Sequence, residues 1–417
     1  MRRHPPATPP ILHLKLTAKT RAEELTLQFQ KLQQQRHPPT STAIEEVELR
    51  IDRSFLLGRN AGSDGVLNAL HQGLLGLETI RKVNIWGPYD TGFPIFVLRQ
   101  LIIGTTSRSR LTHLSLNQLT CTGNPAEFKD FVEAIYQCTQ LQELRLQSFG
   151  IPEQTSEEWL AQALAHVRLI AVQGSNETVL STLLTPRFVQ TLCQKSCNLQ
   201  KLVLFSYIFP DSDTALVLKA LTRSSHTKLQ EASLGLTCGT QGGLALAEYL
   251  QMTTALQKLW LRVSSLANEE SNEAIAQALR TASPSLLEFG LYGEGYLSAE
   301  SQQCFTDSLK ITEYNNNDNN SNNQYCNTSL QVMELQSAEE SEERNMYLVL
   351  NKIGRRQLLL SSHTGNDADE TEKVRLCDET NNPQQQRWVE ALVQVKHDLS
   401  CIYYLLNANP MLLAIKQ

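Results

Sequence analysis

A six-residue pattern, apolar-x-x-apolar-x-apolar, recurs along most of the chain. Copies begin at residues 44, 80, 111, 141, 167, 199, 229, 256 and 286, and a late copy begins at residue 330. From residue 80 to residue 286, successive copies start 26 to 32 residues apart. Alternating apolar positions predict a short β-strand that is buried on one side. The regular spacing predicts that each strand belongs to one of a series of structural repeats.

The segments between these strands carry a helical pattern. Apolar residues recur at intervals of three and four in residues 128–136 and again in residues 274–279, which is typical of amphipathic helices. Pro186 stands where the first turn of a helix accepts a proline. We therefore expect one strand and one helix per repeat. The strands should form a parallel sheet with the helices behind it, because a single repeat cannot bury its own apolar side.

Repeats of about 30 residues that open with LxxLxL and contain full helices resemble those of ribonuclease-inhibitor-like leucine-rich-repeat proteins. The resemblance covers roughly residues 44–311. It implies an α/β fold, a leucine-rich-repeat solenoid whose curved parallel sheet has helices on its outside. That family often places Asn or Cys three residues after the third leucine, and the absence of this polar ladder predicts uneven repeats. The chain instead has Leu119, Phe149, Tyr207, Thr237, Ser264 and Glu294 at these positions.

The two ends of the chain differ from the repeats. Residues 1–40 are expected to form an atypical N-terminal capping unit with a strand from Ile11 to Leu16 and a helix after it. The repeat array then occupies residues 41–311. Residues 312–345 are expected to form an asparagine-rich and acidic low-complexity insert that contains the late repeat strand.

Residues 346–417 are expected to form a C-terminal helical cap. Apolar residues from Trp388 to Leu406 recur at alternating steps of four and three, a heptad-like seam that either covers the end of the array or forms a dimerising coiled coil. The block NKIGRR, followed by a WV…D…YYLLNANP helix, resembles the tail of a set of uncharacterised microalgal repeat proteins. This second resemblance implies no activity.

Composition argues against several classes of function. The formal net charge is −6 with both signs spread along the chain, whereas nucleic-acid-binding proteins usually present a basic face. No window approaches the roughly 18 apolar residues of a membrane span, and MRRHPPATPP lacks the apolar core of a secretory signal. Nine cysteines form no CxxC pair, which favours buried free thiols over a zinc or redox site. We expect a cytoplasmic protein, with the nucleus as an alternative, and no cofactor.

Alternate residues of the strands should face the concave side of the sheet. One column of such residues changes sign from strand to strand, which predicts lateral ion pairs: Lys201, Glu231, Lys258 and Glu288. A second group combines the residue types that dominate interface hot spots, and we predict that it binds a partner: Phe205, Trp260, Arg262 and Tyr292. Ser233 and Gly290 should leave room for the Trp260 ring, and Gly235 should open space beside Phe205 and Arg262. The alternative is that these rings pack on one another or under a terminal cap.

Catalytic motifs are missing from the sequence. The glycine-rich stretch Gly58–Gly65 lacks the Lys-Ser/Thr of a P-loop, and no HExxH, GxSxG or kinase set occurs. We expect a non-catalytic protein–protein interaction scaffold that binds a protein partner on the concave sheet face, as a monomer unless the C-terminal helix dimerises. The resemblance leaves two alternatives: a regulator of a small GTPase, of the GTPase-activating type, and a substrate receptor of a ubiquitin ligase. No F-box precedes the array, which disfavours the second.

Overall fold

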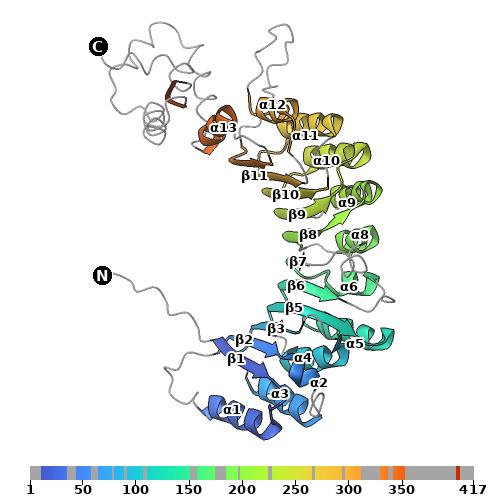
Figure 1. The fold of residues 1–417 in the computed structure, drawn as a ribbon, viewed down its shortest axis with the longest axis vertical. Coiled ribbons are helices and arrows are strands. Elements are labelled where there is room, and N and C mark those ends of the chain that lie inside the picture. Colours follow the sequence, from blue (N-terminus) through green and yellow to red (C-terminus); the bar gives the residue numbers. More distant parts are fainter. Residues whose placement is uncertain are drawn as a thin grey trace, which may run out of the picture. The chain divides into compact units, whose positions relative to one another are not determined.

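The computed structural model describes residues 11–34, 44–57, 64–77, 79–88, 92–106, 110–150, 157–173, 185–195, 198–223, 228–264, 268–293, 296–310, 329–336, 341–352 and 401–403. The chain forms two compact units, residues 1–236 and residues 237–417. In each unit the helices lie along one face of the strands (Figure 1).

The first unit is built on parallel strands that lie side by side in chain order. They are β1 (Ile11–Leu16), β2 (Glu46–Ile51), β3 (Lys82–Trp86), β5 (His113–Thr122), β6 (Glu143–Gly150), β7 (Leu169–Gln173), β8 (Lys201–Phe209) and β9 (Glu231–Leu236). A short strand, β4 (Gly92–Pro94), pairs with the end of β5. A parallel neighbour needs a crossover connection, and the intervening helices supply it.

The helices of the first unit pack in sequence. They are α1 (Ala22–Gln34), α2 (Arg53–Leu57), α3 (Asp64–Gly76), α4 (Ile95–Thr106), α5 (Pro125–Tyr136), α6 (Glu157–Ala163), α8 (Pro186–Lys195) and α9 (Asp211–Arg223). The longer helices contact their neighbours from α1 to α9. Helix α5 buries Phe128, Phe131 and Ile135, as its apolar spacing predicts. Helix α8 begins at Pro186, also as predicted.

The second unit repeats this arrangement. Its elements are α10 (Thr240–Met252), β10 (Lys258–Val263), α11 (Glu269–Thr281), β11 (Glu288–Gly293), α12 (Ala299–Asp307), β12 (Val332–Leu335) and α13 (Glu342–Lys352). Strands β10, β11 and β12 are parallel neighbours in that order. Helix α10 packs on α11, and α11 packs on α12. Both units therefore have the α/β leucine-rich-repeat fold that the sequence predicts.

The leucines of the repeat pattern form the core between strands and helices. Leu256, Leu259 and Leu261 are each 0% exposed. The register of the strands also places the third residue of each repeat pattern beside the third residue of the next, as the repeat spacing predicts: Glu46 lies opposite Lys82, Lys82 opposite His113, and His113 opposite Glu143. The predicted columns thus correspond to real rows of side chains across the first unit.

The repeats are uneven, as predicted, at the positions where the polar ladder is missing. In β5 and β6 the second residue after the repeat pattern, Gln118 and Ser148 respectively, has a positive φ, of 55° and 50°. This left-handed conformation, uncommon for residues other than glycine, redirects the chain so that Leu119 and Phe149 enter the core, where they are 0% and 1% exposed. An apolar side chain thereby takes the place of the polar ladder.

Strand β8 departs further from the predicted column. Leu204 pairs with Leu234, but the next pair joins Ile208 to Gly235, so the residues between Leu204 and Ile208 form a bulge. The predicted column, which sets Gly235 opposite Phe205, is therefore wrong, because Gly235 lies opposite Ile208. A bulge places additional residues of one strand opposite a single residue of its neighbour, and sequence spacing alone does not reveal it.

Other sequence expectations are met where the structure describes them. The N-terminal strand and helix form as β1 and α1, and the late repeat strand forms as β12. Six cysteines among the described residues are free thiols, and all except Cys304 are buried. No described helix is long and apolar enough to cross a membrane. The C-terminal seam, apart from residues 401–403, lies outside the described residues, and the limits set at residues 40, 311 and 345 stay predictions.

Candidate functional site

The sheet face that the helices leave open carries the residues at alternate strand positions, and we call it the open face. In the second unit, Trp260 of β10 and Tyr292 of β11 lie on it and are partly exposed. Their ring centroids are 5.7 Å apart, and the ring planes are inclined by 18°. This is a stacked pair, an arrangement worth about 0.5–1.5 kcal/mol beyond the area that it buries.

The absence of a side chain at Gly290 allows the indole ring of Trp260 to lie against the sheet. The two residues are register partners on β10 and β11. A Cβ atom at Gly290 would lie only 2.0 Å from Cε3 of Trp260 and 2.4 Å from its Cζ3. The expectation that Gly290 leaves room for this ring is confirmed, because the indole occupies the space that a side chain would fill.

Tyr292 is fixed from the other side. Its hydroxyl donates a hydrogen bond to a carboxylate oxygen of Glu334 on β12. Burial raises the pKa of the Tyr292 phenol, and the adjacent Glu334 carboxylate raises that pKa further. The hydroxyl therefore keeps its proton and continues to donate at neutral pH.

Arg262 completes this group. It lies two residues after Trp260, and hence on the same face of β10, opposite Tyr292 in the register. Its side chain is partly exposed, and within the described part of the chain no residue forms an ion pair or side-chain hydrogen bond with it. We call Trp260, Arg262 and Tyr292 the Trp260 patch. The structure brings these three predicted residues together.

Phe205, the fourth predicted residue, belongs to the first unit. It is partly exposed and lies at the bulge of β8, so it follows no regular column. The Trp260 patch is defined without it.

The predicted lateral ion pairs are present within each unit. Nζ of Lys201 lies 2.5 Å from a carboxylate oxygen of Glu231, and Nζ of Lys258 lies 2.9 Å from one of Glu288. Exposed pairs of this kind contribute only about 0–1 kcal/mol each. Their main effect is to leave the rim of the open face polar and internally neutralised.

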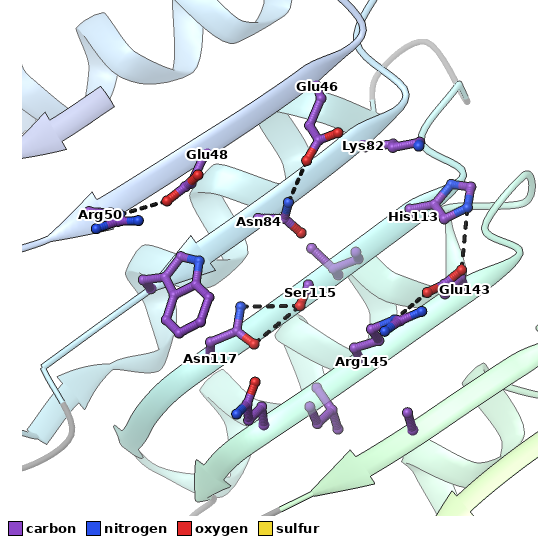
Figure 2. Close-up of a pocket in the computed structure, with 15 residues that line it drawn as sticks. Glu46, Glu48, Arg50, Lys82, Asn84, His113, Ser115, Asn117, Glu143 and Arg145 are labelled. Carbon is purple, nitrogen blue, oxygen red and sulfur yellow. Dashed lines mark hydrogen bonds and ion pairs between the residues drawn. The ribbon is translucent and has the colours of Figure 1, made fainter. Parts of the chain in front are cut away.

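A second feature of the open face is a hollow of about 570 Å³ in the first unit. Its lining comes from strands β2, β3, β5, β6 and β7, and most of its side chains are polar or charged (Figure 2). We call it the β2–β6 hollow. The sequence placed these residues in their columns but did not distinguish them as a site.

Two copies of one side-chain cluster border the hollow. In the first, Nδ1 of His13 lies 3.1 Å from Oε2 of Glu48, and Nε of Arg50 lies 2.6 Å from Oε1 of the same carboxylate.

The second cluster repeats these residue types three strands further along the sheet, with the histidine contact made through the other ring nitrogen. Nε2 of His113 lies 3.4 Å from Oε2 of Glu143, and Nε of Arg145 contacts Oε1. In both clusters the histidine stands directly opposite the glutamate on the preceding strand. The sequence signal was available: Glu-x-Arg occurs on both strands, each preceded by a histidine in the same column.

The floor of the hollow is held by amide side chains. The Asn84 amide donates to Glu46 at 2.8 Å. The Asn117 amide donates to the Ser115 hydroxyl at 3.1 Å and to the carbonyl of Ile85 at 3.4 Å. Asn117 is only 4% exposed. These bonds orient the floor residues before any ligand binds.

The imidazole of His113 is mainly in its neutral form at pH 7. Burial lowers its pKa below the usual range, and this outweighs the opposite effect of Glu143, while Lys82 and Arg145 lower the pKa further. The imidazole can therefore hydrogen-bond to the Glu143 carboxylate without adding a full positive charge. No group of three or more His, Cys, Asp or Glu in the described part of the chain is arranged to hold a metal ion.

No protein-family model and no curated protein matches this chain. Among solved structures, it is similar to the leucine-rich-repeat-containing protein LegL7 from Legionella pneumophila, with 14% identity and a TM-score of 0.38, over 71% of this chain and 89% of that one. It is also similar to TLR13 in its complex with ssRNA13, with 14% identity and a TM-score of 0.36, over 70% of this chain and 36% of that one. A third similarity, to the yeast Rad7 and Elc1 complex, has 14% identity and a TM-score of 0.34, over 65% of this chain and 77% of that one.

Proposed function

We propose that this chain is a non-catalytic protein–protein interaction scaffold, and that the Trp260 patch anchors a protein partner on the open face. The observation that carries the proposal is the fixed but partly exposed aromatic pair. Trp, Tyr and Arg dominate binding energy at protein interfaces, and all three occur here side by side on two adjacent strands.

Preorganisation supports this assignment over simple ring packing. Gly290 seats the Trp260 indole, and Glu334 holds the Tyr292 hydroxyl. Side chains that are already ordered lose little entropy when a partner binds. Arg262 adds a guanidinium beside them, which suits a partner with an acidic or carbonyl group next to an apolar one.

The experiment compares partner capture by the full-length chain and by a Trp260→Ala, Tyr292→Ala variant, from extract of the native cell. The matched control is Tyr136→Ala, which removes an aromatic ring that is 57% exposed on helix α5. Circular dichroism confirms folding of each protein. Each captured protein is then purified, and its affinity for all three chains is measured directly. Hot-spot truncation typically costs 2 kcal/mol or more.

We expect the double variant to lose about 30-fold or more in affinity and the Tyr136 control to bind normally. Equal binding by all three chains would contradict the role of the patch. The alternatives drawn from the family resemblance call for their own assays. Accelerated GTP hydrolysis by a captured GTPase would support a regulator, and co-purified ligase subunits would support a substrate receptor.

A further inference from the structure

The β2–β6 hollow has an imbalance between hydrogen-bond donors and acceptors. Both carboxylate oxygens of Glu48 are engaged, one by His13 and one by Arg50. Both oxygens of Glu143 are engaged in the same way by His113 and Arg145. Each carboxylate oxygen at the two sides of the hollow therefore already has one donor within the protein.

The arginine donors are not used up in this way. Arg50 and Arg145 each contact their glutamate through Nε, and no described residue forms a hydrogen bond or ion pair with their terminal guanidinium nitrogens. The Arg50 and Arg145 side chains are 68% and 57% exposed, whereas Glu48 and Glu143 are only 16% and 18% exposed. The carboxylates are thus largely shielded from solvent, whereas the guanidinium groups are accessible to a ligand.

Lys82 adds a third cation to the lining of the hollow. Its side chain is exposed, and none of the residues that the structure describes forms an ion pair with it. Glu46, its register partner on β2, has one oxygen occupied by Asn84. The accessible part of the hollow is consequently richer in donors than in acceptors, which favours a ligand that carries carboxylates.

The spacing of the cations indicates the form of that ligand. Arg50 lies on β2 and Arg145 on β6, with β3 and β5 between them; Figure 2 shows them on opposite sides of the hollow. The register places Arg145 in the row of Glu48, two residues before Arg50. Three strand spacings and this offset together amount to about 16 Å, which an extended peptide covers in about four to five residues. Trp86 on β3 is the register partner of Arg50. It also lines the hollow and is partly exposed.

We propose that the β2–β6 hollow binds an extended acidic peptide segment that crosses strands β2 to β6. Two acidic side chains about four residues apart bind Arg50 and Arg145, and an apolar side chain between them packs on Trp86. Lys82 binds a further carboxylate or a backbone carbonyl. A nucleic acid fits less well, because Glu46, Glu48 and Glu143 would lie under a continuous row of phosphates.

This inference rests on the proposed function, since it takes the open face to be a protein-binding surface. The two proposals can nevertheless be disproved separately. The hollow lies within the first unit and the Trp260 patch within the second, so variants of one leave the other intact.

The test measures binding of fluorescein-labelled seven-residue peptides to the full-length chain by fluorescence anisotropy. The first peptide has Glu at positions 2 and 6 and Leu at position 4; the others replace both Glu by Gln, or place the two Glu side by side. The chain variants are Arg50→Gln with Arg145→Gln, and separately Lys82→Gln. A matched control, Arg99→Gln with Arg223→Gln, makes the same charge change on helices α4 and α9.

We expect the spaced Glu peptide to bind about ten-fold more tightly than the Gln peptide, since charge-assisted bonds are stronger than neutral ones. The Arg50, Arg145 variant should lose that preference, the Lys82 variant should lose part of it, and the Arg99, Arg223 control should retain it. Added salt should weaken binding, because the guanidinium groups are exposed. Circular dichroism on every variant separates loss of binding from loss of folding.

Three results would overturn the proposal: equal binding of the Glu and Gln peptides, an unchanged preference in the Arg50, Arg145 variant, or displacement of the peptide by single-stranded RNA at lower concentration than by unlabelled peptide. The Trp260→Ala, Tyr292→Ala chain serves as a further arm. If this variant binds the acidic peptide normally, the hollow binds the peptide independently of the Trp260 patch.

Discussion

Gly290→Ala tests whether the Trp260 patch is held in place as described. The added methyl carbon would lie 2.0 Å from Cε3 of Trp260, whereas carbon atoms in contact are about 3.5–4.0 Å apart. The indole must therefore move by about 1.5 Å or more, and its stacking on Tyr292 at 5.7 Å cannot persist unchanged. Loss of the stack removes about 0.5–1.5 kcal/mol of interaction energy.

The assay is a double-mutant cycle that needs no partner. Urea unfolding of the Trp260→Ala, Tyr292→Ala and combined variants yields the coupling free energy between the two rings. We expect about 0.5–1.5 kcal/mol in the natural background and a value near zero when Gly290→Ala is present. Gly65→Ala is the control background, because the nearest atom to its new methyl group is 3.8 Å away.

The structural argument would be refuted if the coupling energy were the same with and without the Gly290→Ala change. That result would mean that the ring pair tolerates the methyl group, so that Gly290 does not seat the indole. A coupling energy near zero in the natural background would equally show that the pair contributes no preorganisation.

Three further predictions concern stability. Asn124→Ala removes the capping box that Asn124 and Glu127 form at the start of α5; we expect a loss of about 1 kcal/mol, seen as roughly five-fold faster amide hydrogen exchange in the first turn, and an unchanged rate would contradict it. Gly243→Ala places a Cβ 2.3 Å from Cβ and Oγ of Ser271, and we expect destabilisation of about 1–3 kcal/mol in urea unfolding despite the better helix propensity of Ala. Burial lowers the pKa of His113 in the folded chain, so the unfolded chain binds more protons and stability falls as the pH drops through about 6.5. His113→Gln should show a smaller loss of urea midpoint between pH 7.5 and pH 5 than the natural chain, and an identical loss would exclude this contribution.

Cysteine reactivity offers an independent check of the core. Burial raises the pKa of Cys138 and of Cys193 to about 12, which suppresses the reactive thiolate at neutral pH. We expect both thiols to react with a disulfide reagent only after the chain unfolds. Rapid labelling of either residue in the folded chain, identified by mass spectrometry, would contradict the described packing.

The sequence by itself determined the repeated strand and helix, the buried leucines and the columns of the open face. It could do so because strand side chains alternate with a period of two, and because repeats that bury the same face must stack in register. The pairing of Lys258 with Glu288 and the space at Gly290 follow from that register.

Only the tertiary structure decided which neighbours interact and how. It showed that Tyr292 stacks on Trp260 and binds Glu334, and that one histidine–glutamate–arginine arrangement occurs twice around a hollow. It also moved Gly235 from Phe205 to Ile208 through the bulge in β8. The physical reason is that the repeat pattern determines only the strand position of a residue. Its rotamer, together with nearby left-handed residues and bulges, determines which neighbours its side chain contacts.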